Sequence, residues 1–274
     1  MKINKTLFYL SIFTLFIIIS SCKKKDDSVD TNTTSASNCV MALNSFSAIK
    51  NIVDEAGFKN GAYNGILNDT TIHVRFDTIN HADVDTINID FGTNFLLCAD
   101  GRIRKGKITT TYNGHYTDTS KTHLITLTNY YVDNNRVNGT IKDNYKGYNT
   151  TGHQHFYDTI NGNITLSTGK MIAWYATTKL DFTAGDSTAA WSDNVLSING
   201  NASGSTSDGD GFSMLISTPV VRNFGTGCRQ YLVKGVMQIA VSSKPYRAAD
   251  LGDGTCDDLI TVSIDGSNYQ VHTN

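Results

Sequence analysis

Residues 160–182 have the sequence INGNITLSTGKMIAWYATTKLDF, and this stretch decides the fold class. Apolar residues alternate with polar ones as far as Leu166 and again from Ile172 onward. The tetrapeptide Ser167-Thr168-Gly169-Lys170 separates the two runs. A period of two on both sides of a Gly-containing turn predicts a β-hairpin with one buried face and one hydrated face.

The same alternation recurs along most of the chain, with turn residues between the runs. Asn113-Gly114 and the segment Asp133-Asn134-Asn135-Arg136 mark two further hairpins. This rhythm predicts about a dozen strands, and a sheet of that size usually curls or splits into two layers. We therefore expect an all-β fold, namely a large antiparallel meander that is curled or folded into a two-layer sandwich or roll. The alternating runs begin at Ile72, Ile87, Ile160, Ile172, Phe212, Tyr231 and Ile260.

One segment near the N-terminus has a helical period instead. Its apolar residues fall close to every 3.6 positions, which predicts one short amphipathic helix. Asn44 or Ser45 would cap its start, and Gly57 would end it. We expect this helix to cover one end or an open edge of the sheet. The apolar positions are Leu43, Phe46, Ile49, Val53 and Ala56.

The first two dozen residues have the three parts of a secretory leader. Lys2 and Lys5 precede an apolar run from Leu7 to Ile19, and Ser20-Ser21-Cys22 follows. The run is shorter than the roughly 20 residues that a membrane-spanning helix needs. Ile19-Ser20-Ser21-Cys22 resembles the lipobox of bacterial lipoproteins, and this resemblance implies that Cys22 is acylated, with palmitate-type chains, and becomes the first mature residue. The alternative is an ordinary cleaved signal peptide with a cysteine nearby.

These features divide the chain into three parts. Residues 1–21 are predicted to be the lipoprotein signal peptide, and residues 22–38 the lipidated Cys22 with a flexible tether rich in Lys, Asp, Ser, Thr and Asn. Residues 39–274 are predicted to form a single antiparallel β domain. Lys23-Lys24-Lys25-Asp26-Asp27 resembles the export signal of surface lipoproteins in Bacteroidota, which implies the cell outer membrane with external display. The periplasmic face is the alternative.

A broader resemblance rests on several short motifs. They are Ile89-Asp90-Phe91-Gly92, Cys98, residues 100–108, Tyr112, residues 129–132, and the closing Gly252-Asp253-Gly254-Thr255-Cys256-Asp257-Asp258 with the strand after it. Together they resemble a group of uncharacterised Bacteroidota lipoproteins. The resemblance implies a β fold and an envelope location, and it implies no activity.

Four cysteines remain once Cys22 is set aside, namely Cys39, Cys98, Cys228 and Cys256. In an oxidising compartment an even number favours two disulfides, and all three connectivities stay open. A zinc site is the rival interpretation, but the chain has no C-x-x-C pair. The formal net charge of −2 gives no electrostatic case for binding nucleic acid.

Several groups of residues have the composition of a site but a simpler explanation. His153 and His155 lie on one strand face, and with His115 or His123 they would make a metal site, although histidines on a hydrated strand are usually surface residues. The acidic loops at 208–211 and 250–258 lack the full EF-hand spacing. Residues 185–187, Gly-Asp-Ser, begin like an esterase motif but lie between two strands. We therefore predict no cofactor and no metal.

A basic cluster at the start of a strand is the last feature with a candidate role. We expect it to blunt an exposed sheet edge against aggregation, with contact to an anionic glycan as the alternative. The cluster consists of Arg102, Arg104, Lys105 and Lys107.

The sequence has no convincing catalytic set, because neither Gly-x-Ser-x-Gly nor HExxH occurs. The first hypothesis is an outer-membrane-anchored lipoprotein with a non-catalytic binding or structural role, whose partner is a glycan or an envelope protein. A surface glycan-active hydrolase is the alternative, and it requires two carboxylates in one cleft. An envelope lipid carrier is the third, and it requires an empty apolar groove inside the rolled sheet.

Overall fold

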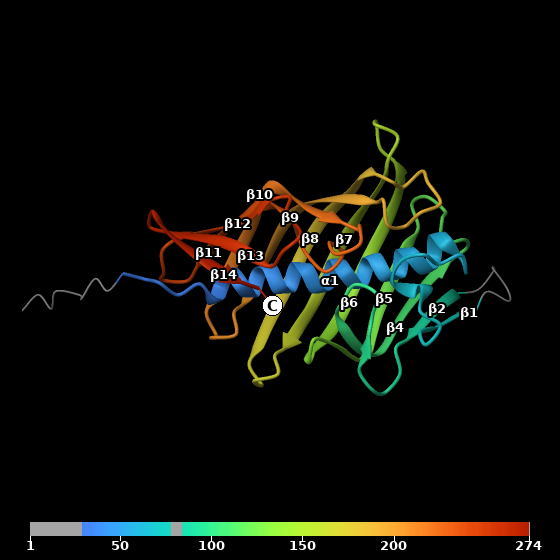
Figure 1. Ribbon diagram of the computed structural model, residues 1–274, viewed down its shortest axis with the longest axis horizontal. Helices are drawn as coiled ribbons and strands as arrows, with labels where there is room; N and C mark the ends of the chain where they lie inside the picture. Colours follow the sequence, from blue (N-terminus) through green and yellow to red (C-terminus); the bar gives the residue numbers. More distant parts are fainter. Residues whose placement is uncertain (1–28, 78–83, 274) are drawn as a thin grey trace, which may run out of the picture.

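One long α-helix and one antiparallel sheet account for most of the described chain, residues 29–77 and 84–273, in the computed structural model (Figure 1). The helix is α1 (Thr34–Lys59), and a short 3-10 helix, η1 (Ile66–Asn68), follows it. The strands are β1 (His73–Asp77), β2 (Val84–Asp90), β3 (Leu96–Leu97), β4 (Ile103–Asn113), β5 (Thr122–Val132), β6 (Asn135–Tyr148), β7 (Gln154–Thr165), β8 (Met171–Ala184), β9 (Val195–Ser205), β10 (Gly211–Asn223), β11 (Lys234–Val241), β12 (Arg247–Asp253), β13 (Leu259–Ile264) and β14 (Ser267–His272).

The strands follow one another across the sheet in chain order, as a meander. Each pairs antiparallel with its neighbours from β1 to β14, except that β3 pairs only with β4. The hairpin of residues 160–182 is confirmed, since Ile164 on β7 pairs with Ile172 on β8. The hairpin predicted at 133–136 is also confirmed, because Val132 pairs with Asn135 around a two-residue turn. The all-β prediction is therefore correct.

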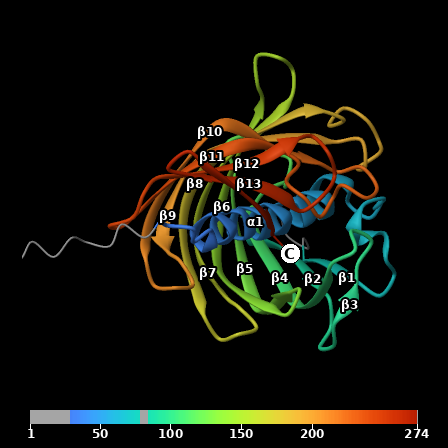
Figure 2. The same cartoon turned by 60° about the vertical axis from the view of Figure 1, so that its left-hand side comes forward.

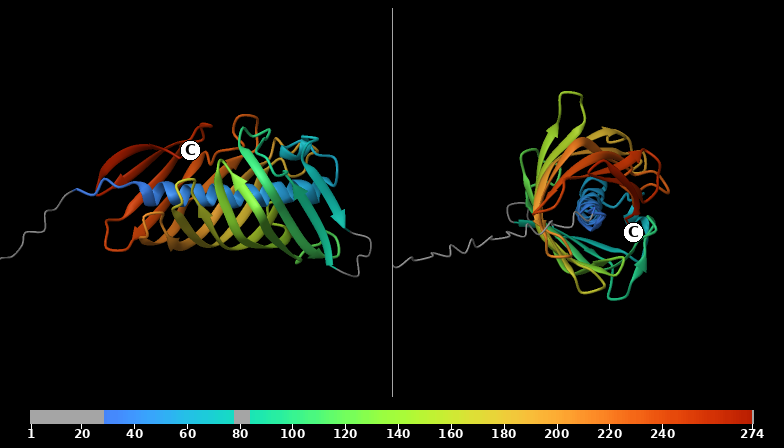
Figure 3. Two further views of the ribbon diagram at one scale, coloured as in Figure 1. Left: turned by 90° about the horizontal axis from the view of Figure 1, so that it is seen from below. Right: turned by 90° about the vertical axis from the view of Figure 1, so that its left-hand side faces the viewer.

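The sheet is a single open layer that rolls around α1. A view along the long axis shows the strands curving around the helix (Figure 3, right), and the helix runs along the inside of the curve (Figure 2). Strands from both ends and from the middle of the sheet touch α1, namely β2, β4, β6, β8, β11 and β12. Shifts of register in several strand pairs mark β-bulges, which bend strands and increase their twist.

The helix is longer than the sequence predicts, and it does not cover an end or an edge of the sheet as expected. It has 26 residues, begins at Thr34 rather than near Asn44, and ends at Lys59, where Asn60 adopts a left-handed conformation with φ of 39°. It lies within the roll instead of at an end or edge, and every residue from Leu43 to Ala56 is buried. A helix surrounded by sheet has no solvent face, so the apolar positions alone could not mark its limits.

Two glycines let the helix approach its neighbours closely. A Cβ added at Gly162 on β7 would lie 2.4 Å from Cζ of Phe46, and one added at Gly57 would lie 2.2 Å from the ring of Tyr116. Both distances are far below normal contact, so only glycine fits at these positions. The rows of apolar side chains on the inner face of the sheet then pack directly against α1.

The boundary placed between a tether and the domain at residues 38 and 39 is wrong. Residues 34–38 form the first turns of α1, and Ser35 and Ala36 are buried. Before the helix, Asp30 forms an ion pair with Arg247 on β12, and Arg247 Nε donates to Asn32 O at 3.1 Å. The small polar side chains of residues 30–38 have the composition of a flexible tether, but contacts with the rest of the fold hold this segment against the sheet.

Candidate functional site

A cluster of ionisable side chains lies completely inside the roll, between the middle of α1 and three adjacent strands. Lys50 and Asp54 come from successive turns of the helix, and the ammonium nitrogen Nζ of Lys50 donates to Asp54 Oδ1 and Oδ2 at 2.6 and 2.5 Å. We call this group the lysine cluster. It consists of Lys50, Asp54, Tyr116, His123, Asp143 and Asp158, whose exposed fractions are 0–5%.

Strand register brings the sheet members of the lysine cluster together. His123 on β5 is the partner of Asp143 on β6, and Asp143 is the partner of Asp158 on β7. Asp143 Oδ2 accepts from His123 Nδ1 at 2.8 Å and lies 3.4 Å from Lys50 Nζ. Three ionisable side chains therefore form one row across the inner face of the sheet, directly opposite the helix.

Aromatic rings close the remaining sides of the lysine cluster. Lys50 Nζ lies 3.8 Å from the ring centroid of Phe156, and the ring of Tyr116 stacks on that of His123 at 4.0 Å. The hydroxyl of Tyr116 donates to Asp54 Oδ1 at 2.8 Å. Cation–π contact and stacking stabilise charged groups that have lost their hydration shell.

The carboxyl groups of the lysine cluster have different proton affinities. Burial raises the pKa of Asp158 well above its ordinary value, and the charge of Asp143 raises it further. Burial would also raise the pKa of Asp143, but Lys50 and the hydrogen bond from His123 outweigh it and lower that pKa. The opposite directions of these shifts favour the proton on Asp158 and the charge on Asp143, its partner across the strand pair.

A second buried ionic group, which we call the arginine cluster, consists of Asp100, Arg104 and Tyr130. Arg104 Nη1 and Nη2 donate to the two oxygens of Asp100 at 2.6 Å each, and Arg104 Nε donates to the Tyr130 hydroxyl at 3.2 Å. Burial alone would raise the pKa of Asp100, but the Arg104 guanidinium outweighs it and lowers that pKa. This is a fork-to-fork pair, the strongest form of ion pair that the two side chains can make.

A third buried cation faces α1 without a carboxylate partner among its hydrogen bonds. Arg222 on β10 donates to the backbone and side chain of Asn44, to Ser47 Oγ at 2.9 Å and to Arg229 O at 2.8 Å. Burial and the neighbouring Arg102 lower the pKa of Arg222 to about 9, so the guanidinium stays charged at neutral pH. Neutral oxygens thus fix the N-terminal half of the helix to β10.

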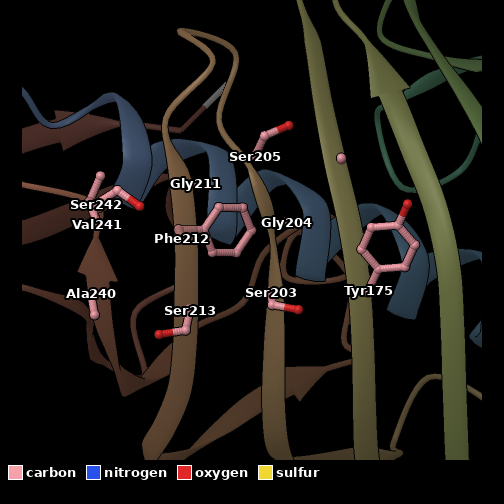
Figure 4. Close-up of a pocket in the computed structure, with 11 residues that line it drawn as sticks. Tyr175, Ser203, Gly204, Ser205, Gly211, Phe212, Ser213, Ala240, Val241 and Ser242 are labelled. Carbon is pink, nitrogen blue, oxygen red and sulfur yellow. The ribbon is translucent and has the colours of Figure 1, made fainter.

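On the outside of the roll, a shallow depression of about 740 Å³ crosses β8, β9, β10 and β11. Figure 4 shows Tyr175 beside a row of serines, with the helix behind the strands. Gly211 has no side chain to fill the surface, and no lining side chain carries a charge. Hydroxyl groups and one exposed tyrosine suit a neutral, polar ligand. The lining residues are Ala173, Tyr175, Ser203, Gly204, Ser205, Gly211, Phe212, Ser213, Ala240, Val241 and Ser242.

The cysteine prediction is half right. Cys228 and Cys256 form a disulfide with a Cα–Cα distance of 4.8 Å, which joins the β10–β11 loop to the β12–β13 loop. The expected second disulfide is wrong, because Cys39 and Cys98 are buried free thiols. Cys39 lies on α1 and Cys98 precedes β4, and burial raises the pKa of both thiols. Cys22 lies outside the described residues.

The candidate metal and catalytic residues have separate structural contacts. His153 Nδ1 and the backbone N–H of Gln154 bind the carboxylate of Asp186 at 2.7 and 2.8 Å, so the Gly185-Asp186-Ser187 segment holds the β8–β9 loop against β7. His123 belongs to the lysine cluster. Among residues 29–77 and 84–273, no three His, Cys, Asp or Glu side chains are grouped to hold a metal ion.

The acidic loops are explained by local contacts. Asp208 pairs with Lys170 at 2.8 Å, and Asp210 with Lys244 at 2.5 Å, so both carboxylates tie neighbouring hairpin turns together. Asp250 and Asp253 accept hydrogen bonds from backbone N–H groups two residues later. Such Asx turns are the usual reason for Asp beside Gly in loops.

The prediction that the basic cluster blunts a sheet edge is wrong. Its strand, β4, lies between β2 and β5. Arg104 is buried in the arginine cluster, Arg102 Nε pairs with Asp133 at 2.6 Å, and Lys107 pairs with Asp90 at 3.0 Å. Lys105 lies over the ring of Tyr131, 4.5 Å from its centroid. Each cation already has a partner within the fold, which leaves little charge for an anionic ligand.

The lysine cluster is not among the predicted sites, although the sequence contains a signal for it. Asp143 lies in phase with Ile141 and Tyr145, and Asp158 in phase with Phe156 and Ile160, so both acids occupy inward positions of alternating strands. Lys50 and Asp54 are four residues apart and so share a helix face. Ionisable residues at the inward positions of two strands and on one face of the helix indicate a buried polar network.

No family model matches the chain, and neither the curated proteins nor the solved structures contain a significant match. Within the described residues, no helix combines the length and the apolar character needed to cross a membrane.

Proposed function

We propose that this chain is a lipid-anchored, non-catalytic binding module of the outer membrane, and that its ligand is a neutral glycan of the cell envelope. One observation carries the proposal: α1 fills the inside of the roll, so the surface open to a ligand is the outer face of the sheet. That face holds the uncharged depression around Tyr175.

The filled interior argues against the lipid carrier. A carrier needs an empty apolar space large enough for acyl chains. Here Phe46, Ile49, Ile52 and Val53 of α1 occupy that space, and each is at most 1% exposed. An acyl chain would enter only if the helix left, and a buried ion pair between Lys50 and Asp143 and a buried hydrogen bond from Arg222 to Ser47 hold it in place.

The positions of the carboxylates argue against the hydrolase. Asp54, Asp143 and Asp158 converge in one place, as a pair of catalytic acids would, but they are 2%, 0% and 4% exposed. A glycosidic bond must lie between two accessible carboxyl groups, with room for water. The lysine cluster has no such access, because α1 covers it on one side and the sheet on the other.

The depression has the chemistry that a neutral glycan requires. Serine hydroxyls donate and accept hydrogen bonds, and the flat face of an exposed tyrosine packs against the C–H face of a sugar ring. Tyr175 is 52% exposed and borders the row of Ser203, Ser205 and Ser213. We expect one or two sugar rings to lie along this row.

A glycan array probed with the full-length chain tests the binding proposal, and Tyr175→Ala tests the surface. We expect Tyr175→Ala to weaken binding about tenfold or more, equivalent to about 1.4 kcal/mol. Tyr157→Ala is the matched control, because Tyr157 is 45% exposed on the neighbouring strand β7 but does not line the depression. Equal losses in both variants, or the absence of any retained glycan, would refute the proposal.

The anchor is tested separately, through Cys22→Ala. We expect the variant to lose labelled fatty acid and to leave the membrane fraction, since several acyl chains on one residue hold a protein firmly. Protease added to whole cells distinguishes the two orientations: a displayed domain is cut, and one on the periplasmic face is protected. A Cys22→Ala chain that stays acylated and membrane-bound would exclude the lipobox.

A further inference from the structure

The lysine cluster has a composition that stability alone does not require. One ammonium group faces three carboxyl groups, and three polar atoms, Asp143 Oδ1, Asp158 Oδ1 and His123 Nε2, are buried without a hydrogen-bond partner. Unpartnered buried polar atoms cost stability, and an ion pair of this kind is often replaceable by apolar residues. A sealed group of this kind can act only on its own side chains.

We propose that Lys50 and Asp143 become joined by an amide bond between Nζ of Lys50 and Cγ of Asp143, which forms spontaneously inside the folded protein. The nucleophile is held 3.4 Å from Asp143 Oδ2, an oxygen bonded to the carbon that would be attacked. Asp158, directly opposite Asp143 in the strand pair, is the acid, and Asp54, in contact with Nζ, carries protons.

The reaction needs no external reagent. Asp54 takes one proton from the ammonium group of Lys50, and Asp158 gives its proton to an oxygen of Asp143 as Nζ attacks Cγ. The nitrogen then returns a proton to Asp158, and Asp54 gives its proton to the departing hydroxyl group. One N–C bond forms, one C–O bond breaks and one water molecule leaves, while Asp54 and Asp158 regain their starting states.

Asp143, rather than Asp54, has the environment of the electrophile. Its Oδ2 accepts a hydrogen bond from His123 Nδ1, which draws electron density from the carboxyl carbon. Both oxygens of Asp54 instead accept hydrogen bonds from Lys50, and one also accepts from Tyr116, as suits a proton carrier. Burial raises the pKa of Asp54, which favours its transient protonation.

Burial favours the amide over its hydrolysis. Lys50 is 0% exposed and Asp143 is 0% exposed, and Phe156 lies against Nζ, so the product water has no bulk phase around it to reverse the reaction. Fixing two reactants side by side supplies the entropy that an intermolecular condensation lacks. The bond would fasten α1, the first helix after the proposed anchor, to β6 in the middle of the sheet.

Mass spectrometry of the full-length chain tests this proposal directly. After reduction, the wild type should be lighter than its sequence mass by one water, relative to a Lys50→Arg variant prepared in the same way. Trypsin should give one branched product, residues 26–59 joined to residues 143–146, because an amide at Lys50 blocks cleavage there. Lys59→Arg is the matched control, because Lys59 is a partly exposed lysine at the end of the same helix, and this variant should keep the mass deficit.

Asp158→Asn should abolish the deficit while keeping a side chain of the same shape. The wild-type measurement decides the matter even if this variant fails to fold. A wild type at its full sequence mass overturns the proposal, and so does a water loss located between Lys50 and Asp54 or at Asp253-Gly254, where a succinimide could form.

Discussion

The arginine cluster and the lysine cluster are both buried ionic groups, and they differ in how their charges are matched. Arg104 meets one carboxylate, Asp100, through two parallel hydrogen bonds of 2.6 Å. Lys50 meets three carboxyl groups from α1, β6 and β7. The first pair comes from residues four apart in one loop and strand, whereas the second group exists only because α1 lies inside the sheet.

The difference shows what each cluster can do. The Arg104 guanidinium is matched to a single carboxylate, so the pair has no proton to transfer and both oxygens of Asp100 already accept hydrogen bonds. The arginine cluster therefore contributes stability. In the lysine cluster the raised pKa of Asp158 favours its protonated form, and Asp143 and Asp158 each retain an unpartnered oxygen. A network with a mobile proton is suited to chemistry between its own side chains.

The largest effect is expected from breaking the matched pair. Asp100→Ala leaves the guanidinium of Arg104 buried and without its carboxylate, which should lower the free energy of unfolding by about 3–5 kcal/mol. Urea titration followed by circular dichroism measures the loss. Asp90→Ala is the control, because Asp90 pairs with Lys107, which is 54% exposed, and should cost about 0–1 kcal/mol. Equal losses in the two variants would mean that Arg104 finds another partner.

A methyl group added at the contact between helix and sheet should disturb the lysine cluster and leave the arginine cluster unchanged. Gly162→Ala places a Cβ about 2.4 Å from Phe46 Cζ, and overpacking of this kind costs about 1–3 kcal/mol. Because α1 supplies Lys50 and Asp54, we expect NMR signals of His123 to shift while those of Arg104 stay in place. Adding Phe46→Leu should restore both stability and the His123 signals; a variant that moves the two clusters equally would contradict the distinction.

Much of the fold follows from the sequence, because strands that are hydrated on one face keep a strict alternation. Ile160, Ile164 and Ile172 predict the central hairpin, and the structure confirms it. The choice between a sandwich and a roll could not be predicted, since curvature depends on bulges and on what fills the inside. Lys50, which looks like an exposed residue beside Ile49, is buried only because the sheet closes over both sides of the helix.

The lysine cluster could not be predicted for a related reason: its residues meet only in the folded sheet. Asp143 and His123 are 20 residues apart, and only strand register makes them partners. Cys228 and Cys256 form one of the pairings that the sequence left open, because two loops at one end of the sheet meet there. Cys39 stayed free because its stretch, thought to begin the domain, is already part of the buried helix.

The pH dependence of stability should have opposite signs in the two clusters. The pKa of Asp100 is lowered below its ordinary 3.8 by Arg104, which outweighs burial, so its contribution is present above that value and is lost as the pH falls through the folded-state pKa. The pKa of Asp158 is raised by burial and by Asp143, so its contribution is present below 3.8 and is lost as the pH rises through the folded-state pKa.

Two amide variants measure these contributions. In the wild type, the free energy of unfolding should fall at low pH as Asp100 becomes protonated, and Asp100→Asn should make this fall smaller. The free energy should also fall as the pH rises above 3.8 because of Asp158, and Asp158→Asn should make that second fall smaller. Urea titrations at a series of pH values give both slopes. If both variants changed the fall at low pH in the same direction, Asp158 would be ionised in the folded protein and could not act as the acid.

The smallest effects are expected from removing one hydroxyl group from each cluster. Tyr116→Phe deletes a 2.8 Å hydrogen bond to Asp54, and the carboxylate keeps only Lys50 as a donor, so we expect a loss of about 1–2 kcal/mol. Tyr130→Phe deletes a 3.2 Å contact from an Arg104 that keeps both bonds to Asp100, so about 0.5–1 kcal/mol should be lost. Both variants keep the aromatic ring, so urea titration isolates the hydroxyl. A larger loss for Tyr130→Phe would mean that the arginine cluster, rather than the lysine cluster, depends on every one of its donors.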